Sequence, residues 1–304
     1  MVVRGVSQGI EKVSKVLMPL LFLLLAGLVV YSVTRPGAGE GLRFLFGIDP
    51  AKLSGDTLVG ALGQAFFSLS VGMGIMVTYG SYVPKSENLA KSAGWICALD
   101  TLVAVMAALA IVPVVMITQG EEGLGMGGGF AFISLPAMFA ELPGGRFFGT
   151  AFFALLFLAA LTSAISILES LVAFLTEEFH LSRARAAIGL SVPMALLSAG
   201  YSLSQSAGRG INLPWFDFKN GLQMLPMNAV MEKFTDNLMI PLGALCFCLF
   251  VGWVWGTKAA GQEIAGEHGL RRMQKPWAFA VRFLAPLVIV VILYFTLGMG
   301  EGLS

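Results

Sequence analysis

The chain has 304 residues, 57% of them hydrophobic and 12% charged, and its mean hydropathy is +0.82. A soluble protein of this length needs far more charge on its surface, so the composition indicates a multi-pass membrane protein. The formal net charge of +1 gives no strongly basic character, and we expect no nucleic-acid partner.

Seven apolar stretches are long enough to cross a bilayer, which requires about 20 residues per helix. In chain order they cover 16–34, 58–83, 93–117, 147–176, 184–205, 237–256 and 277–298. The longer connectors between them cover 35–57, 118–146 and 206–236. We therefore predict an all-α helix bundle with about seven transmembrane helices, forming a single transmembrane domain over 1–304.

The placement of lysine and arginine predicts the orientation of these helices, because cytoplasmic loops carry an excess of both residues. The N-terminal segment and the connectors near 84–92, 177–183 and 257–276 carry more of them than the longer loops of the other side. We therefore expect a protein of the cell inner membrane with a cytoplasmic N-terminus and a C-terminus on the outer side.

The second span contains GQAFFSLSVGMGIMVTYGSY, residues 63–82, which is unusual for a plain spanning helix. Ser68 and Ser70 would point about 200° apart on an unbroken helix, and Gly72 and Gly74 lower the cost of unwinding. Polar backbone groups at membrane depth are tolerated where they line a cavity or meet a ligand or ion. The pattern indicates either a broken helix at a transporter binding site or small residues that let two helices pack closely.

Asp100 is the only charged residue of the third span, ICALDTLVAVMAALAIVP. Burying a lone carboxylate in a membrane is costly, so Asp100 requires a partner. A hard cation such as sodium is one candidate, because hard cations prefer oxygen ligands. The alternative is an aspartate that is protonated or lies in a first helical turn near the membrane interface.

The connector 118–146 is apolar for a loop, with Gly127–Gly129 followed by FAFISLPAMFAELPGG. We expect two short helical turns broken at Pro136, because proline disrupts a helix interior. This segment would fold back onto the bundle as an extracellular lid, or lie as a helix in the membrane interface.

The fourth span contains FLAALTSAISILE, in which Thr162 and Ser163 follow Ala159 by three and four residues. On a helix both hydroxyls lie close to the Ala159 carbonyl, so three oxygens could bind a small cation. The alternative is the common backward bond from a hydroxyl to a carbonyl within a membrane helix.

Acidic residues lie within or near the fourth and sixth spans. Glu169 is deep enough to require a hydrogen-bond partner, whereas Glu177 is either solvated or part of a gate ion pair. Glu232 and Asp236 precede the sixth span, as gate acids or as solvated residues of a loop end. No nucleophile and base stand in a catalytic arrangement, so we expect no enzyme.

Four motifs in this order, GQAFFSLSVGMGIMVTYGSY, the Asp100 span, LTSAISILE and GGFAFISLPAMF, resemble the neurotransmitter:sodium symporter family. The similarity is to its bacterial amino-acid transporters of the leucine-transporter fold and covers nearly the whole chain. It implies two inverted five-helix repeats followed by one or two further helices. The implied function is sodium-coupled symport of an amino acid.

The resemblance also implies which residues form the substrate pocket. The pocket would be lined by Phe67, Ser68, Ser70, Met73 and Ile167. Met73 is flexible and unbranched, so the pocket could accept a hydrophobic or aromatic amino acid.

Two sodium sites are implied in the same way. The first would contain Ser68 and Asp100, and the second the Ala159 carbonyl with Thr162 and Ser163. Chloride should not be required, because Asp100 places negative charge beside the ion where family members often carry asparagine. Ala104, where chloride-dependent relatives have serine, agrees with that expectation.

The resemblance assigns Glu232 to an outer gate, and Tyr82 and Glu177 to an inner gate. It also pairs the first span with the family's fifth helix and the last with its eleventh, so the family's first four helices have no counterpart. We therefore expect the carboxyl-terminal part of a truncated or split transporter, which would need an amino-terminal four-helix segment or a full-length relative. The alternative is a non-transporting scaffold or regulatory fragment that pairs with such a relative.

Overall fold

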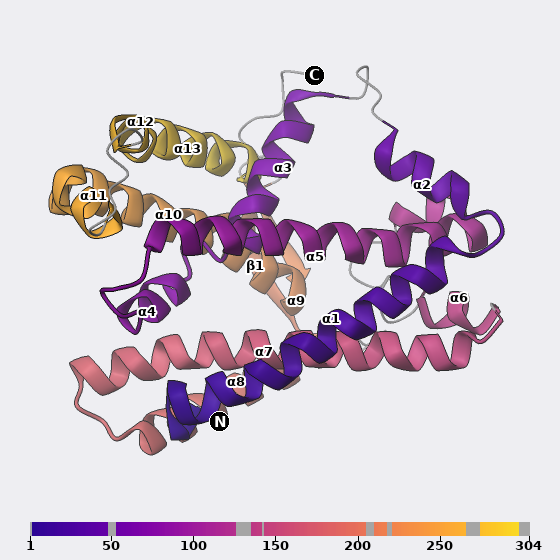
Figure 1. The fold of residues 1–304 in the computed structure, drawn as a ribbon, viewed down its shortest axis with the longest axis horizontal. Coiled ribbons are helices and arrows are strands. Elements are labelled where there is room, and N and C mark those ends of the chain that lie inside the picture. Colours follow the sequence, from indigo (N-terminus) through magenta and orange to yellow (C-terminus); the bar gives the residue numbers. More distant parts are fainter. Residues whose placement is uncertain are drawn as a thin grey trace. The chain divides into compact units, whose positions relative to one another are not determined.

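The computed structural model describes residues 2–47, 53–125, 135–141, 143–204, 210–217, 221–265 and 274–297 (Figure 1). The chain divides into two compact units, one of residues 1–52 with 98–166 and one of 53–97 with 167–304. Within the described residues, six helices are long and apolar enough to cross a membrane. The expected single transmembrane domain over 1–304 stays a prediction.

The first unit is built around apolar helices. Its complete elements are the 3₁₀-helix η1 (Val2–Arg4), the π-helix η2 (Val6–Ile10), α1 (Glu11–Val33), α2 (Ala38–Phe46), the 3₁₀-helix η4 (Glu121–Gly125) and α6 (Leu135–Glu141). It also includes most of α5 (Leu89–Thr118) and the first part of α7 (Gly145–Glu178). One buried core contains Leu25, Val114 and Leu155 from three of these helices. Their apolar side chains pack closely there, at the density typical of protein interiors.

Tyr31 near the end of α1 connects that helix to the segment before α7. Its hydroxyl donates to the Pro143 carbonyl oxygen at 3.0 Å, and its ring stacks on Phe148 with 3.7 Å between centroids. The Arg35 guanidinium also lies over the Tyr31 ring, 4.5 Å from its centroid. A buried tyrosine needs a hydrogen-bond partner for its hydroxyl, and the Pro143 carbonyl is that partner. These contacts therefore hold the end of α1 against the segment before α7.

The segment expected to be a lid is described only in part, because residues 126–134 and 142 lie outside the described residues. The helical turn expected before Pro136 lies outside the described residues, and α6 includes Pro136 in its first turn, where a missing N–H costs no helical hydrogen bond. Leu135 and Phe139 are buried in the first unit's core. The function of 118–146 as a lid stays a prediction.

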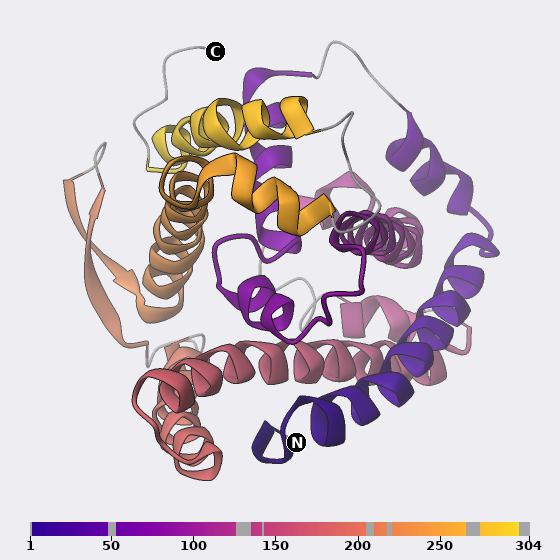
Figure 2. The same cartoon turned by 60° about the vertical axis from the view of Figure 1, so that its left-hand side comes forward.

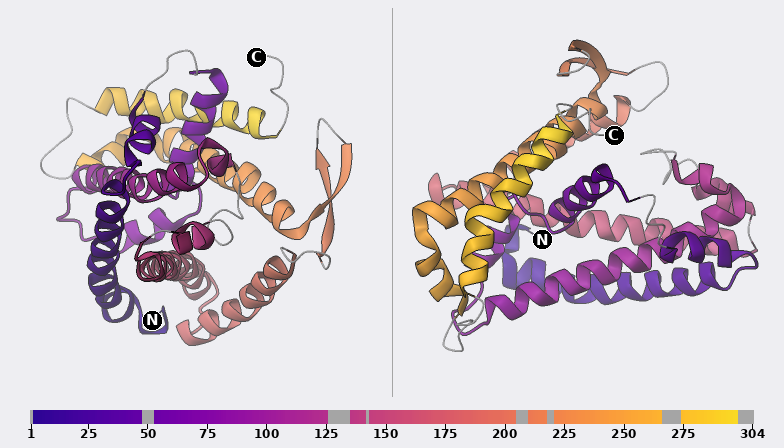
Figure 3. Two further views of the ribbon diagram at one scale, coloured as in Figure 1. Left: turned by 90° about the vertical axis from the view of Figure 1, so that its right-hand side faces the viewer. Right: turned by 90° about the horizontal axis from the view of Figure 1, so that it is seen from above.

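The second unit contains the remaining elements. They are α3 (Gly55–Ser68), α4 (Ile75–Ser81), α8 (Arg183–Ser204), β1 (Asn212–Asp217), β2 (Gly221–Pro226), α9 (Met227–Glu232), η7 (Lys233–Met239), α10 (Ile240–Leu249), η8 (Phe250–Gly256), α11 (Thr257–Ala265), α12 (Gln274–Phe279), η10 (Ala280–Leu284) and α13 (Ala285–Thr296). Figure 3 shows α13 lying alongside α10, and the two helices contact each other.

Two features of this unit differ from the expected loop over 206–236. A hairpin forms there, with antiparallel pairing from Asn212–Pro226 to Asp217–Gly221. The sixth span also begins earlier than predicted, because α9 begins at Met227 and continues through the π-helix η7 into α10. Glu232 and Asp236 therefore lie within a helix and do not precede one.

Candidate functional site

The second predicted span is interrupted, as one of the two sequence interpretations required. The helix α3 ends at Ser68 and α4 begins at Ile75, so six residues between them are not helical (Figure 2). Ser70 has φ 54°, Gly72 has φ 97° and Gly74 has φ 76°. Three left-handed residues in five cannot belong to an α-helix, and Ser70 is strained there because it carries a Cβ.

A few hydrogen bonds hold this break, which we define as residues 69–74. The Val71 N–H donates to the Phe66 carbonyl at 3.0 Å, and the Ser70 N–H donates to the Phe67 carbonyl at 3.0 Å. On the other side, the Thr78 hydroxyl lies 3.2 Å from both the Gly74 carbonyl and the Ser170 hydroxyl of α7. The break is thus an ordered turn that connects α3 to the residues beside α7.

The break also lies directly against α10. A Cβ at Gly72 would come closer to the Ile240 carbonyl oxygen and the Ala244 nitrogen than real Cβ atoms do. Conversely, a Cβ at Gly243 would overlap the Gly72 carbonyl oxygen. Backbone meets backbone here, which only glycine on both sides permits.

A cavity of about 310 Å³ lies next to the break, among α3, η7, α10 and α13. It is mostly apolar, with Phe66, Phe67 and Ile240 among its walls, and Gln64 and Asp236 add polar groups. Among the predicted substrate residues, Phe67 alone lines this cavity, so the cavity does not coincide with the predicted substrate pocket.

The predicted substrate residues all belong to the second unit. Ser68, Ser70 and Met73 are half-buried at the break, whereas Phe67 and Ile167 are exposed. Four of them lie in or beside the break and Ile167 lies on α7, and their roles in a substrate pocket stay predictions.

The predicted sodium ligands are found mainly in the first unit. Thr162 donates from its hydroxyl to the Ala159 carbonyl at 2.9 Å, the backward bond that the sequence left as an alternative. Ser163 is exposed, Asp100 is half-buried on α5, and Ser68 belongs to the second unit. The Thr162–Ala159 pair already brings two oxygens together, so a cation there would replace a hydrogen bond between them.

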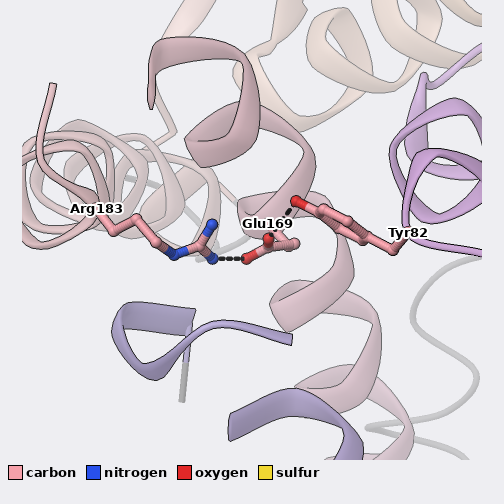
Figure 4. Close-up of polar contacts among 3 residues, drawn as sticks. All are labelled: Tyr82, Glu169 and Arg183. Carbon is pink, nitrogen blue, oxygen red and sulfur yellow. Dashed lines mark hydrogen bonds and ion pairs between the residues drawn. The ribbon is translucent and has the colours of Figure 1, made fainter. Parts of the chain in front are cut away.

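The most buried charge in the described residues is Glu169 of α7, whose exposed fraction is 0%. Its Oε2 pairs with Nη2 of Arg183 at 2.5 Å, and its Oε1 accepts from the Tyr82 hydroxyl at 3.0 Å (Figure 4). Both carboxylate oxygens are therefore satisfied, which a buried carboxylate requires. The sequence indicated that Glu169 needs a partner but assigned Arg183 to a loop, and nothing in the sequence joined either one to Tyr82.

Changing Tyr82 to phenylalanine should lower the free energy of unfolding by about 1–2 kcal/mol, because Glu169 Oε1 loses its donor while buried. Chemical denaturation of the purified protein measures this. Tyr294→Phe is the matched control, since Tyr294 is exposed on α13, and its effect should stay within about 0.5 kcal/mol. Equal losses in the two variants would contradict the contribution of the Tyr82–Glu169 bond.

The other predicted gate residues have different surroundings. Glu232 accepts a 2.5 Å hydrogen bond from the Tyr201 hydroxyl of α8, a contact the sequence did not predict. Glu177 is exposed near the end of α7. The gate roles of Glu232, Tyr82 and Glu177 stay predictions.

Comparison with known proteins decides the family. A model of the Sodium:neurotransmitter symporter family matches residues 1–301. The chain belongs to this family. Within it, the chain is 33% identical over 304 residues to YhdH of Bacillus subtilis (strain 168), named an uncharacterized sodium-dependent transporter, covering 98% of the chain and 64% of YhdH.

Two further proteins similar to this chain are informative. A sodium-dependent transporter of Haemophilus influenzae (strain ATCC 51907 / DSM 11121 / KW20 / Rd) is 33% identical over 296 residues, which are 95% of the chain and 61% of that protein. The crystal structure of MhsT in complex with L-phenylalanine matches with a TM-score of 0.81 and 37% identity, over 97% of the chain and 64% of MhsT. The chain therefore spans less than two thirds of the length of these relatives.

Membership of this symporter family confirms three expectations. The fold is an all-α membrane bundle of the type seen in MhsT, and this chain also contains the two-stranded β1–β2 sheet. The chain is a multi-pass membrane protein, since six of its helices are long and apolar enough to span a membrane. The family is one of transporters, which agrees with the expectation that the chain is not an enzyme.

Proposed function

We propose that this chain takes part in sodium-coupled symport of an amino acid across the cell inner membrane. The observation that carries the proposal is the break at 69–74, where three residues with positive φ interrupt an apolar helix. A discontinuous membrane helix is the usual place for substrate and ions in secondary transporters. The names of the bacterial relatives as sodium-dependent transporters support the choice of sodium.

The substrate in this proposal is a hydrophobic or aromatic amino acid. Phe67, Ser68, Ser70, Met73 and Ile167 would line its pocket. The structure of MhsT with L-phenylalanine supports this class and supplies the probe. Met73 is an adaptable side chain at the break, which suits apolar side chains of different shapes.

Sodium would be held at two sites. We assign Ser68 and Asp100 to the first on the resemblance alone, and the Ala159 carbonyl with Thr162 and Ser163 to the second. The Thr162 hydroxyl and the Ala159 carbonyl are hydrogen-bonded at 2.9 Å, and a sodium ion at the second site would replace this bond. Ions and substrate would then act by favouring one state in an outward–inward equilibrium.

The gates would close the two ends of the path. Tyr82 and Glu177 would belong to the inner gate and Glu232 to the outer gate, with the N-terminus of the chain in the cytoplasm. The Tyr82–Glu169 bond supports the inner assignment, because it connects the end of α4 to a buried charge of α7. Segment 118–146 would act as an extracellular lid.

Transport is proposed for the complete transporter, by which we mean this chain together with the family's first four helices. Those helices could belong to the same polypeptide or to a full-length relative. In either arrangement the chain would supply the second of the two inverted repeats.

Uptake of labelled L-phenylalanine by the complete transporter in proteoliposomes tests the proposal. A sodium gradient should drive uptake, whereas potassium at the same ionic strength should not. Replacing chloride with gluconate should leave uptake unchanged, because Asp100 supplies negative charge beside the ion. Equal uptake in sodium and potassium would refute the coupling, and loss of uptake in gluconate would refute chloride independence alone.

A further inference from the structure

Arg282 lies inside one of the apolar helices that are long enough to cross a membrane, Gln274–Thr296. It follows the start of that helix by eight residues, or about 12 Å along the axis. A charged side chain inside a membrane helix is costly and needs a partner. The guanidinium of Arg282 therefore requires acceptors near the edge of the hydrocarbon layer.

One side of this guanidinium is held by the neighbouring helix. Its Nε donates to the Gly252 carbonyl oxygen of η8 at 2.8 Å, and its Cζ lies 5.9 Å from the centroid of the Trp253 ring. The two helices approach closely because Gly252 has no side chain: a Cβ there would lie 3.3 Å from Arg282 Cγ. This contact holds Arg282 against η8 and leaves most of its N–H donors for other acceptors.

The terminal nitrogens of Arg282 have no acceptor in the part of the chain that the structure describes. Neither forms a hydrogen bond or ion pair with a described residue, and neither is a buried atom without a partner. They therefore reach the surface. Glu263 is the one acid in 250–265 and 274–297, and no ion pair joins it to Arg282. The positive charge is thus uncompensated within these described segments.

The surface beside Arg282 is aromatic and open. Trp253, Phe279 and Phe283, which we call the aromatic surface, are 60%, 61% and 51% exposed. The ring of Phe283 lies 5.8 Å from that of Trp253 and 5.7 Å from that of Phe279, between centroids. Aromatic side chains gather where hydrocarbon meets the lipid headgroups. Because both helices are of membrane-spanning length, lipid surrounds this surface.

The same end of the two helices carries further positive charge. Lys275 is exposed seven residues before Arg282, on nearly the same helical face, because two turns of α-helix take about seven residues. Lys258 is exposed on α11, which continues from η8 and contacts α12 (Figure 1). A guanidinium binds phosphate oxygens through its planar fork, and lysines near a membrane surface add attraction for anionic lipids.

We propose that Arg282 and the aromatic surface form a binding site for an anionic phospholipid. The terminal nitrogens of Arg282 bind the phosphate oxygens, Lys258 and Lys275 attract the headgroup, and the aromatic surface contacts an acyl chain. The bond to Gly252 keeps the guanidinium fork in one orientation. Charge complementarity selects this occupant, because an uncompensated cation lies beside an apolar surface in contact with lipid. The site does not depend on the proposed transport function.

Arg282→Gln in the complete transporter tests the site. Phosphatidylglycerol is the anionic probe, and phosphatidylcholine, which has a phosphate but no net charge, is its comparison. Native mass spectrometry of the purified protein measures the Kd of each lipid. The wild type should bind phosphatidylglycerol more tightly, and Arg282→Gln should weaken this binding about tenfold, the loss expected for hydrogen bonds to a charged group. Arg185→Gln is the matched control, because Arg185 is exposed on α8, and its Kd should match the wild type.

Two further variants separate lipid binding from packing. Arg282→Lys keeps the charge without the planar fork, so its Kd for phosphatidylglycerol should lie between those of the wild type and Arg282→Gln. Lys275→Gln leaves the bond to Gly252 in place and should weaken phosphatidylglycerol about fivefold, as expected for one lysine near an anionic surface. Lys275→Gln therefore decides the proposal if the Arg282 variants do not fold.

Quenching of Trp253 by lipids brominated on their acyl chains locates the bound lipid. The difference in fluorescence between the wild type and Trp253→Phe gives the contribution of Trp253. Brominated phosphatidylglycerol should quench this contribution more strongly than brominated phosphatidylcholine at the same mole fraction. This measurement needs no change at Arg282.

Four results would overturn the proposal. An unchanged Kd in both Arg282→Gln and Lys275→Gln would exclude these residues from a lipid site. Equal quenching of Trp253 by the two brominated lipids would mean that anionic lipid has no preferred place there. Quenching by neither would show that another protein segment covers the aromatic surface. Displacement of phosphatidylglycerol by inorganic phosphate would identify a site for a free anion.

Discussion

Asp100→Ala should abolish sodium-dependent binding of L-phenylalanine by the complete transporter. Removing the carboxylate removes the formal negative charge beside the proposed first sodium ion, and hard cations depend on charged oxygen ligands. We expect the apparent sodium affinity to fall by at least about 100-fold, which corresponds to about 3 kcal/mol. Binding of labelled L-phenylalanine as a function of sodium concentration measures this change.

Asp100→Asn is the matched comparison for this experiment. The amide keeps one oxygen of similar position without its charge, so sodium-dependent binding should persist with lower affinity. If Asp100→Ala binds sodium and L-phenylalanine as the wild type does, Asp100 is not part of the site.

Glu169→Gln should have the largest effect on stability. Glu169 is fully buried and holds both the Arg183 guanidinium and the Tyr82 hydroxyl. Neutralising it removes the charge that pairs with Arg183, whose side chain is 28% exposed. Breaking a buried ion pair from one side typically costs 3–5 kcal/mol, and we expect about 3 kcal/mol because Arg183 keeps some contact with solvent.

The control for Glu169→Gln is the ion pair between Glu11 and Lys15. Their side chains are 49% and 72% exposed, so Glu11→Gln should change the free energy of unfolding by less than about 1 kcal/mol. Chemical denaturation in one detergent, followed by tryptophan fluorescence, measures both variants. A similar loss in both would mean that the Glu169–Arg183 contact does not stabilise the fold.

The membrane helices could largely be predicted from the sequence, because long apolar stretches without charge have few alternatives in a bilayer. The predicted span 93–117 lies within α5, and 147–176 lies within α7. The interruption after Ser68 was one of two interpretations, since small and polar residues serve both close packing and unwinding. The positive φ values at Ser70, Gly72 and Gly74 decide between the two interpretations in favour of a broken helix.

Where the prediction failed, packing outweighed local composition. Local composition predicts that the sixth span starts after Glu232 and Asp236, because two acids are typical of a loop end, yet the helix already includes Met227. Glu232 is tolerated there because the Tyr201 hydroxyl donates to it. Local sequence cannot show such a partner, which is 31 residues away.

In the candidate site, too, single residues could be predicted from the sequence, but contacts between residues far apart in the sequence could not. Tyr82 and Glu169 were each recognised, but their contact crosses 87 residues of sequence. The close contact between Gly72 and Gly243 could not be predicted from the sequence. A glycine in an apolar helix permits close packing against any neighbouring helix, so it does not identify its partner.

The 34-residue length of α7 has a consequence for its two acids. Such a helix is about 51 Å long, whereas the hydrocarbon layer of a bilayer is about 30 Å thick. Even with the common tilt of about 20°, several turns of α7 must extend among the lipid headgroups. Glu177 lies eight residues after Glu169, or about 12 Å further along the axis, so dissolved salt and anionic lipids would act on these two carboxylates of one helix to very different extents.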